Sequence, residues 1–171
     1  MKKIIIIGSG GSGKSTFARK LGGCLQLNVY HLDHLLWQPG WKQVPRSEQI
    51  RIQEEILKQE KWILDGNYNG TLDLRIDAAD TIIFLDLPRI LCTYRVGKRM
   101  IRYYGKTRPD MGEDCIERFD FQFLKWVWNY KHTQRPHILD KLQQHSHLKD
   151  IYILNSRQDV KQFLYAIQLK G

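Results

Sequence analysis

The sequence has few cysteines and no long apolar run. Its three cysteines, Cys24, Cys92 and Cys115, are odd in number and lack C-x-x-C spacing, so they indicate neither a disulfide framework nor a zinc site. No apolar run approaches the length that crosses a membrane. The isoleucine run Ile4–Ile7 is too short for a leader segment. We therefore expect a cytoplasmic protein.

Acidic residues are also scarce. The chain has 27 Lys and Arg against 18 Asp and Glu, and the resulting net charge of +9 indicates anionic partners. No acid lies between Asp86 and Asp110. The basic residues of that stretch are Arg89, Arg95, Lys98, Arg99, Arg102, Lys106 and Arg108. Linkers, repeats and low-complexity segments are absent as well, so we expect residues 1–171 to form a single domain.

The N-terminal stretch carries the most specific motif. Ile4–Ile7 predict a short strand buried on both faces of a parallel sheet. Residues 8–15 then fit the phosphate-loop pattern G-x-x-x-x-G-K-[ST], and a helix is predicted to follow. Glycines let the backbone fold into a nest of N–H groups, and a helix N-terminus favours an anion. The residues expected to bind a nucleoside triphosphate are Gly8, Gly10, Gly11, Ser12, Gly13, Lys14, Ser15 and Thr16.

The same residues allow a second interpretation. Residues 8–13 also fit G-x-G-x-x-G, and Asp33 lies twenty residues after Gly13, about where a dinucleotide site has its ribose-binding acid. Lys14 and Ser15 favour the triphosphate, because such a lysine reaches the β- and γ-phosphates and such a serine hydroxyl ligates Mg²⁺. A dinucleotide-binding helix gains nothing from that lysine.

Strand and helix patterns alternate along the rest of the chain. Short apolar runs predict strands over 28–32, 61–64, 81–85 and 151–154. Helices are predicted over 47–60 and 88–104, and a long one carries the apolar stripe Phe119, Phe123, Trp126, Val127 and Tyr130. Ser156 and Asp159 fit a capping box that opens a last helix. This alternation predicts an α/β fold, a three-layer αβα sandwich with a parallel sheet.

Acids follow three of the predicted strands, at the sheet edge where ligands bind. Asp65 fits two roles, holding the water shell of Mg²⁺ beside Ser15 or starting an Asp-Gly turn. Asp33 also fits two, orienting or deprotonating an acceptor hydroxyl or capping a helix or turn. We interpret Asp86, directly before Leu-Pro, as a helix N-cap rather than a catalyst.

A row of cations is the second strong signal. Arg95, Arg99, Arg102 and Lys106 share one face of the predicted helix, where like charges repel unless an anion is bound. Guanidinium groups stabilise the charge that develops during phosphoryl transfer. The row also fits a solvated face or, with the adjacent tyrosines, a nucleic-acid surface.

At this point the sequence resembles a known family. The phosphate loop, Trp62–Gly66, Phe84–Pro88 and the pair Arg95 and Arg99 resemble adenylate kinase and related P-loop small-molecule kinases. Closer still, other motifs resemble bacterial proteins labelled DNA topology modulation proteins. These motifs are Leu32-Asp33-x-x-x-Trp37, Arg108-Pro-Asp110, Cys115-x-Glu117 and Phe123-Leu-Lys-Trp126.

The resemblance implies several features. The parallel sheet would have five strands in the order 2-3-1-4-5. Residues 105–118 would form a small lid, and residues 34–60 would cover the acceptor. Arg95 and Arg99 would contact the phosphates of ATP, and Arg108 would reach in from the lid.

The sequence also departs from that family. Adenylate kinases have Pro-Arg after the Asp-Gly turn, and this arginine grips the acceptor phosphate, whereas Asn67 and Tyr68 stand here. Arg75 and Arg46 are the candidates to replace it. A nucleoside monophosphate is therefore in doubt as the acceptor. The chain lacks an Asn-Lys-x-Asp guanine signature, so we expect ATP rather than GTP.

These patterns together predict an ATP-binding P-loop phosphotransferase that moves the γ-phosphoryl group of ATP to a small-molecule acceptor. The expected catalytic residues are Lys14, Arg95, Arg99, Arg108 and Asp33, and Mg²⁺ is expected at Ser15 and Asp65. The alternative is a basic ATP-binding protein that acts on nucleic acid or DNA topology as a regulator. We expect no membrane partner; the sequence favours a monomer but leaves the oligomeric state and the acceptor open.

Overall fold

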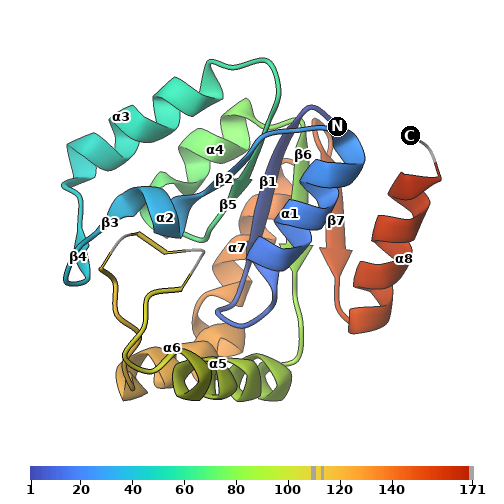
Figure 1. Ribbon diagram of the computed structural model, residues 1–171. Coiled ribbons are helices and arrows are strands. Elements are labelled where there is room, and N and C mark those ends of the chain that lie inside the picture. The colour runs from blue at the N-terminus through green and yellow to red at the C-terminus, as the bar shows by residue number, and fades with distance from the viewer. Residues whose placement is uncertain (109–110, 113, 170–171) are drawn as a thin grey trace.

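The chain folds around one parallel sheet. The computed structural model describes residues 1–108, 111–112 and 114–169. Its central sheet has five strands in the order β2-β5-β1-β6-β7. These strands are β1 (Lys3–Gly8), β2 (Val29–His31), β5 (Trp62–Asp65), β6 (Thr81–Leu85) and β7 (Asp150–Leu154). Counted along the chain, this is the predicted order 2-3-1-4-5, so the α/β sandwich and its topology are confirmed (Figure 1).

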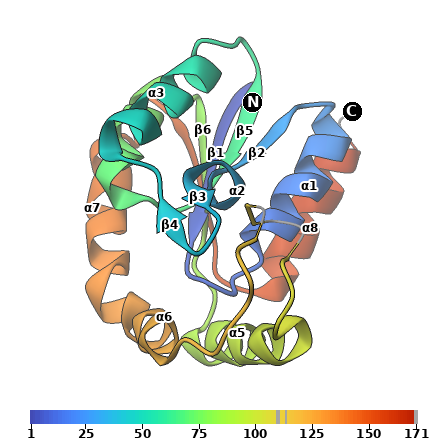
Figure 2. The same ribbon diagram turned by 60° about the vertical axis from the view of Figure 1, so that its left-hand side comes forward.

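Helices cover both faces of the sheet. The layer on one face consists of α1 (Lys14–Leu25) and α8 (Arg157–Gln168). The layer on the other consists of α3 (Arg46–Leu57), α4 (Leu72–Ala78) and α7 (Arg135–Gln144). Beyond the carboxyl ends of the strands lie α5 (Arg89–Tyr103) and α6 (Phe121–Thr133) (Figures 1 and 2).

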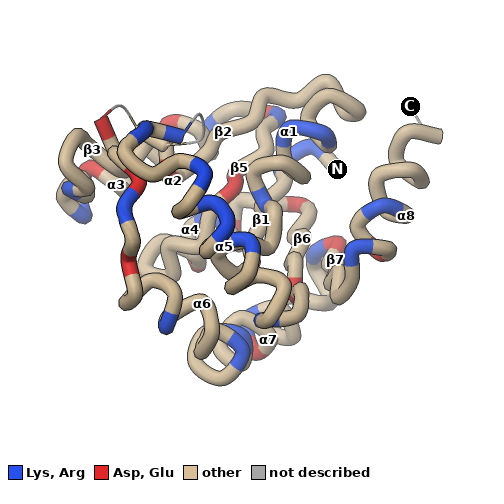
Figure 3. The backbone as a smooth tube through the Cα atoms, turned by 60° about the horizontal axis from the view of Figure 1, so that its bottom comes forward, with Lys and Arg blue, Asp and Glu red and all other residues tan. Residues whose placement is uncertain are grey.

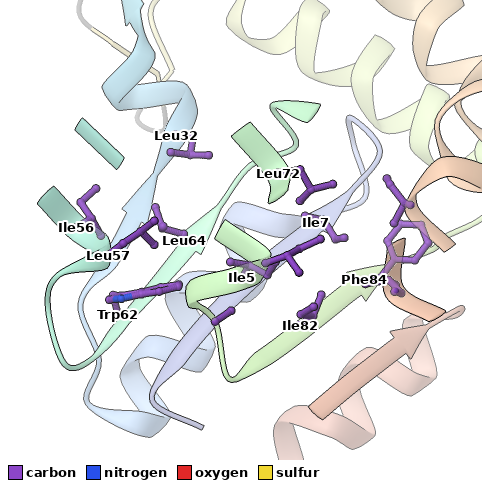
Figure 4. Close-up of a cluster of buried hydrophobic side chains, with 14 of the residues drawn as sticks. Ile5, Ile7, Leu32, Ile56, Leu57, Trp62, Leu64, Leu72, Ile82 and Phe84 are labelled. Atoms are coloured by element: carbon purple, nitrogen blue, oxygen red, sulfur yellow. The ribbon is translucent and has the colours of Figure 1, made fainter. Parts of the chain in front are cut away.

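The alternation of side chains along β1 explains this layering. Ile4 and Ile6 pack into the core beneath α1 and α8, whereas Ile5 and Ile7 pack into the core beneath α3, α4 and α7 (Figure 4). All four are fully buried. Each of the four side chains contributes roughly 1.5–3 kcal/mol of burial energy. The strand therefore leads its glycine loop out of the most buried part of the molecule.

Some local expectations were wrong. The predicted long aromatic helix begins at Phe121, so Phe119 lies outside it, and Asp120 is its N-cap. The helix ends at Thr133, and after Gln134 the chain forms a separate helix, α7, which the sequence patterns do not predict. Asp86 does not cap α5, whose N-cap is Pro88; its Oδ2 instead accepts a hydrogen bond from the Arg135 Nε at 2.7 Å.

A small hairpin contacts the segment between α5 and α6. It consists of β3 (Trp37–Gln38) and β4 (Lys42–Gln43), and it follows the short helix α2 (Leu32–Leu36). Trp41 Nε1 donates to the carbonyl of Ile116 at 2.7 Å, and His34 Nδ1 lies 2.8 Å from the carbonyl oxygen of Met111. Among the described residues, no helix has both the length and the apolar character that crossing a membrane requires.

Candidate functional site

The loop between β1 and α1 is shaped to receive an anion. Gly11 has a φ of 74° and Gly13 a φ of 95°, backbone conformations that favour glycine. Gly13 is the N-cap of α1, and no side chain in the described part of the chain caps that helix. The first N–H groups of a helix have no partner within it. Together with the helix dipole, they make this N-terminus an anion site.

The back of the loop packs tightly against α5 and α6. A Cβ on Gly10 would lie 2.7 Å from the ring of Phe123, and one on Gly11 would lie 2.3 Å from the carbonyl oxygen of Cys92. The hydroxyl of Ser12 is buried without a hydrogen-bond partner among the described residues. The glycines thus allow close packing on one side while the loop keeps donors for a ligand on the other.

The loop opens into a cavity of about 880 Å³, a size typical of small-molecule sites. Its wall brings together most of the predicted site residues, namely Gly10, Gly11, Ser12, Gly13, Lys14, Ser15, Thr16, Asp33, Arg95, Arg99 and Arg108. Gly8, Asp65 and Arg102 lie outside the described wall. Lys106 lies outside it as well, and it is not part of the helix face predicted for it, because α5 ends at Tyr103. Residues from distant parts of the sequence therefore meet at the carboxyl end of the sheet.

Lys14 and Arg95 both contact the loop backbone. Lys14 Nζ donates to the carbonyl oxygen of Ser9 at 3.0 Å. Arg95 Nη1 donates to the carbonyl oxygens of Gly11 and Ser12 at 3.3 and 3.2 Å. Positive charge therefore borders the loop from α1 and from α5, whose row of cations is visible in Figure 3.

Two other arginines share one buried carboxylate. Arg108 Nε lies 2.8 Å and Arg99 Nε 3.4 Å from Glu117 Oε2, and only 3% of the Glu117 side chain is exposed. Arg99 also lies over the ring of Phe123 at 5.7 Å. The carboxylate offsets part of the repulsion between the two guanidinium groups and holds them at the cavity. Glu117 is part of the motif Cys115-x-Glu117, but the spacing of that motif does not predict its ion pairs with Arg99 and Arg108.

The Asp33 carboxyl lies on the cavity wall, just after β2. Its Oδ1 accepts a hydrogen bond from the Tyr68 hydroxyl at 2.9 Å. Burial raises the pKa of Asp33 above its ordinary value, and the positive charge of Lys14 opposes this rise. A carboxyl group with a raised pKa beside a phosphate loop can accept a proton from a hydroxyl.

Asp65, the last residue of β5, is buried and is not part of the described wall. Its Oδ2 is 2.8 Å from His31 Nδ1. Its Oδ1 is buried and has no hydrogen-bond partner among the described residues. Such an oxygen fits the water shell of a bound cation. No group of three His, Cys, Asp or Glu side chains in the described ranges could hold a metal. Magnesium that takes most of its ligands from phosphates and water needs no such cluster.

Arg75 and Arg46, the two candidates to contact the acceptor, donate hydrogen bonds to backbone carbonyls instead. Arg75 is fully buried and donates to the carbonyls of Gly66 and Tyr68 at 2.7 and 3.0 Å. Burial lowers the pKa of Arg75 to about 10. Arg46 donates to the carbonyl of Gly70. Neither belongs to the described cavity wall, so the expectation that one of them faces an acceptor is wrong.

Several residues of the wall were named in the sequence motifs or near them but were given no role in the site. Tyr68 has a φ of 31°, uncommon for a residue with a side chain, and Arg75 holds its carbonyl. Trp37 and Trp41 line the cavity from the hairpin, and Trp126 lines it from α6. The clustering of two tryptophans around Pro-Gly soon after Asp33 was the available signal.

Of the predicted lid 105–118, positions 109, 110 and 113 lie outside the described residues.

Comparison with known proteins supports the fold assignment. No protein-family model matches the sequence, and no curated protein matches it. Among solved structures, shikimate kinase from Acinetobacter baumannii in complex with shikimate is 17% identical, with a TM-score of 0.60 over 99% of this chain and 93% of that one. A gluconokinase from Sinorhizobium meliloti 1021 is 14% identical, with a TM-score of 0.55 over 98% and 90%. Deoxyadenosine kinase from M. mycoides is 17% identical, with a TM-score of 0.50 over 98% and 96%.

The fold and the loop place the chain in a structural class. It has the fold of these small-molecule kinases, and in this chain residues 8–15 follow the carboxyl end of β1. At these identities the likeness shows the fold, and the chemistry has to be argued from the cavity itself.

Proposed function

We propose that the protein is an ATP-dependent small-molecule kinase. The observation that carries the proposal is the shared cavity of about 880 Å³, which is lined by Lys14, Arg95, Arg99, Arg108 and Asp33 together with the phosphate loop. Donors for a triphosphate and an acid suited to an acceptor hydroxyl therefore face the same space. The three similar structures are kinases by name, which supports the same chemistry.

Each residue has a role in this proposal. The loop amides and Lys14 bind the β- and γ-phosphates, as donors at a helix N-terminus do. Arg95, Arg99 and Arg108 stabilise negative charge on the transferring group. Ser15 and Asp65 would hold Mg²⁺. When bound, Mg²⁺ neutralises charge on the phosphate oxygens.

The transfer is a balanced displacement. The acceptor hydroxyl oxygen forms a bond to the γ-phosphorus while the bond from that phosphorus to the β–γ bridging oxygen breaks. ADP leaves with the electron pair of the broken bond, and the hydroxyl proton passes to the Asp33 carboxylate. Residues 105–118 act as a lid and residues 34–60 as the acceptor-covering segment. Their contact, through Trp41 and Ile116, would limit access of water.

Turnover of a Lys14→Ala variant tests the proposal. ATP consumption and phosphorylated product are measured by mass spectrometry over a panel of nucleosides, nucleotides and small hydroxyl compounds. Loss of one preorganised charged donor lowers turnover by about 10²-fold or more. The matched control is Lys98→Ala, an exposed cation on α5, which leaves turnover unchanged. Wild-type turnover in Lys14→Ala would show that the assignment is wrong.

Some expectations stay predictions. These are ATP as the donor, the adenylate-kinase-like arrangement, the cytoplasmic location and the monomeric state. The regulator of nucleic acid or DNA topology also stays a hypothesis, separable by a salt-titrated DNA-binding measurement. Steep loss of binding with salt, and its loss on neutralising Arg99 and Arg102, would favour that hypothesis.

A further inference from the structure

Residues 104–107 pair with residues 116–117 just after α5. The amide of Glu117 donates to the carbonyl oxygen of Lys106 at 2.9 Å, and the amide of Gly105 donates to the carbonyl oxygen of Glu117 at 3.1 Å. We call residues 104–107 and 116–117 the junction. Because both backbone groups of Glu117 are bonded within the junction, the junction determines where its buried side chain starts.

The carboxylate of Glu117 joins two arginines that come from different elements. Its Oε2 lies 3.4 Å from Nε of Arg99, which belongs to α5, and 2.8 Å from Nε of Arg108, which directly follows the junction. Both arginines line the cavity. A single buried carboxylate therefore relates the positions of two cations on the cavity wall.

Arg99 is also fixed from a second side. Its guanidinium carbon lies 5.7 Å from the centroid of the Phe123 ring, within the range of a cation–π contact. The same ring approaches the phosphate loop, where a Cβ on Gly10 would lie 2.7 Å from it. Glu117 and Phe123 together restrict where this guanidinium group can lie relative to the loop.

The hairpin holds the junction from the acceptor-covering segment. The chain between α5 and α6 extends to the hairpin (Figure 1), where Trp41 Nε1 donates to the carbonyl oxygen of Ile116 at 2.7 Å. Cys115 Sγ donates to the carbonyl oxygen of Gln38 at 3.3 Å. Because Ile116 directly precedes Glu117, a movement of the hairpin would move the carboxylate that the two arginines share.

Arg108 also acts on the proposed base. Burial raises the pKa of Asp33, whereas the positive charges of Lys14 and Arg108 lower it. Arg108 is therefore within electrostatic reach of the Asp33 carboxyl group. The position of this one guanidinium group affects both the charge available to a transferring phosphoryl group and the ionisation of the base.

The arrangement favours a role in positioning over a role in stability. A buried ion pair is weak evidence for stability, because the cost of removing charges from water offsets their attraction. Donors that stabilise a transition state must instead be held in place before the reaction. A carboxylate shared by two cavity arginines meets that requirement.

We propose that Glu117 is a positioning residue for phosphoryl transfer, which orients Arg99 and Arg108 toward the transferring group, and that Trp41 links its position to the acceptor-covering segment. This inference rests on the proposed kinase function, because the two arginines act on the group that is transferred. Glu117 itself acts only through them.

The kinetics of Glu117→Gln test the positioning role. Glutamine keeps the shape of the side chain and removes the charge that the two guanidinium groups share. We expect kcat to fall by about 10- to 100-fold while the KM for ATP stays within about twofold, because misplaced groups lose mainly transition-state contacts. Glu117→Asp keeps the charge and restores part of kcat. The control is Asp140→Asn, an exposed acid on α7 outside the described wall, which leaves kcat unchanged.

A second background separates positioning from a structural effect. In a chain that already carries Arg99→Gln and Arg108→Gln, Glu117→Gln should change kcat by less than about twofold, because the groups that it positions are gone. A merely structural residue would lower kcat by the same factor in both backgrounds, and that result would overturn the inference.

Trp41→Phe tests the link and leaves every charged group in place, so it remains informative even if Glu117→Gln does not fold. The change removes the indole N–H and keeps an aromatic ring. We expect the amides of Gly105 and Glu117 to exchange with deuterium about tenfold faster in the full chain, measured by NMR, and kcat to fall at unchanged KM for ATP. The matched control is Trp128→Phe, at an exposed position of α6 outside the described wall, which changes neither quantity. Unchanged exchange in Trp41→Phe would overturn the link.

The two proposals fail in different ways. Wild-type transfer that Glu117→Gln does not slow would keep the kinase function and remove this inference. Absence of transfer to any compound of the panel would remove the kinase function and with it the role of Glu117 in transfer, whereas the exchange measurement would still decide whether Trp41 holds the junction.

Discussion

The hydroxyl of Tyr68 donates a hydrogen bond to the carboxylate of Asp33 at 2.9 Å. The donor lies in the turn after β5 and the acceptor lies after β2, two neighbouring strands of the sheet. This bond lowers the pKa of Asp33, against burial, which raises it. It therefore keeps more of the carboxylate ionised and available as a base.

Tyr68→Phe tests this relationship. Burial and the charge of Asp65 raise the pKa of Asp33, whereas Lys14, the Tyr68 hydrogen bond and Arg108 lower it. Removing the hydroxyl removes one of the lowering contributions, so the pKa of Asp33 rises further. Asp33 acts as a base only when ionised, so activity falls as the pH drops through its pKa. We expect the acid limb of the kcat/KM profile to move to higher pH, with a smaller loss at alkaline pH.

The control for this profile is Tyr165→Phe, a change at a tyrosine that is 63% exposed on α8. Its pH profile should overlay that of the wild type. An acid limb that stays in place in Tyr68→Phe would mean that Asp33 is not the base.

The packing behind the phosphate loop predicts a cost for Gly11→Ala. The new Cβ would lie 2.3 Å from the Cys92 carbonyl oxygen, and the φ of 74° adds backbone strain. We expect a loss of about 1–3 kcal/mol in the free energy of unfolding, measured by urea denaturation. Binding of a fluorescent ATP analogue should weaken as well.

In contrast to Gly11→Ala, the substitution Gly97→Ala in α5 should stabilise the protein. A Cβ there meets no atom of the described chain within 4 Å, and its φ lies outside the left-handed region. Alanine should stabilise the helix by about 0.5–1 kcal/mol. Equal effects of the two substitutions would contradict the close approach of the loop to α5.

Arg75 predicts a stability effect that does not depend on the ligand. In Arg75→Met, the carbonyls of Gly66 and Tyr68 lose their buried donor. We expect a loss of about 3 kcal/mol in the free energy of unfolding. Arg51→Ala is the control, because that exposed side chain pairs only with Glu48 among the described partners, and its urea midpoint should match the wild type. A near-neutral Arg75→Met would show that the turn holds its conformation without the guanidinium.

Magnesium dependence tests Asp65. We expect Asp65→Asn to raise the Mg²⁺ concentration for half-maximal activity about tenfold or more at constant ATP, because the outer shell orients a metal and its waters. Asp73→Asn, at a 67% exposed side chain, is the control. If Asp33→Asn shifts the Mg²⁺ requirement and Asp65→Asn does not, the metal role belongs to Asp33.

Local sequence patterns identified most of the fold. The isoleucine strand, the glycine loop and the capping box of Ser156 and Asp159 all depend on residues a few positions apart, and both reciprocal bonds of that box are present. The same reasoning misplaced Asp86, because its partner Arg135 lies 49 residues away. It also predicted one long helix where the structure has α6 and α7, because the spacing of apolar residues does not show where packing against other elements ends a helix.

The sequence alone determined the phosphate loop and the α/β sandwich, because backbone conformation and strand burial follow from neighbouring residues. Only the tertiary structure decided that Asp33 lines the cavity while Asp65 lies outside its described lining, that Arg75 is buried in a turn, and that Trp37 and Trp41 line the same cavity. Those outcomes depend on which side chains meet across the sheet. Such long-range contacts leave no periodic trace in the sequence.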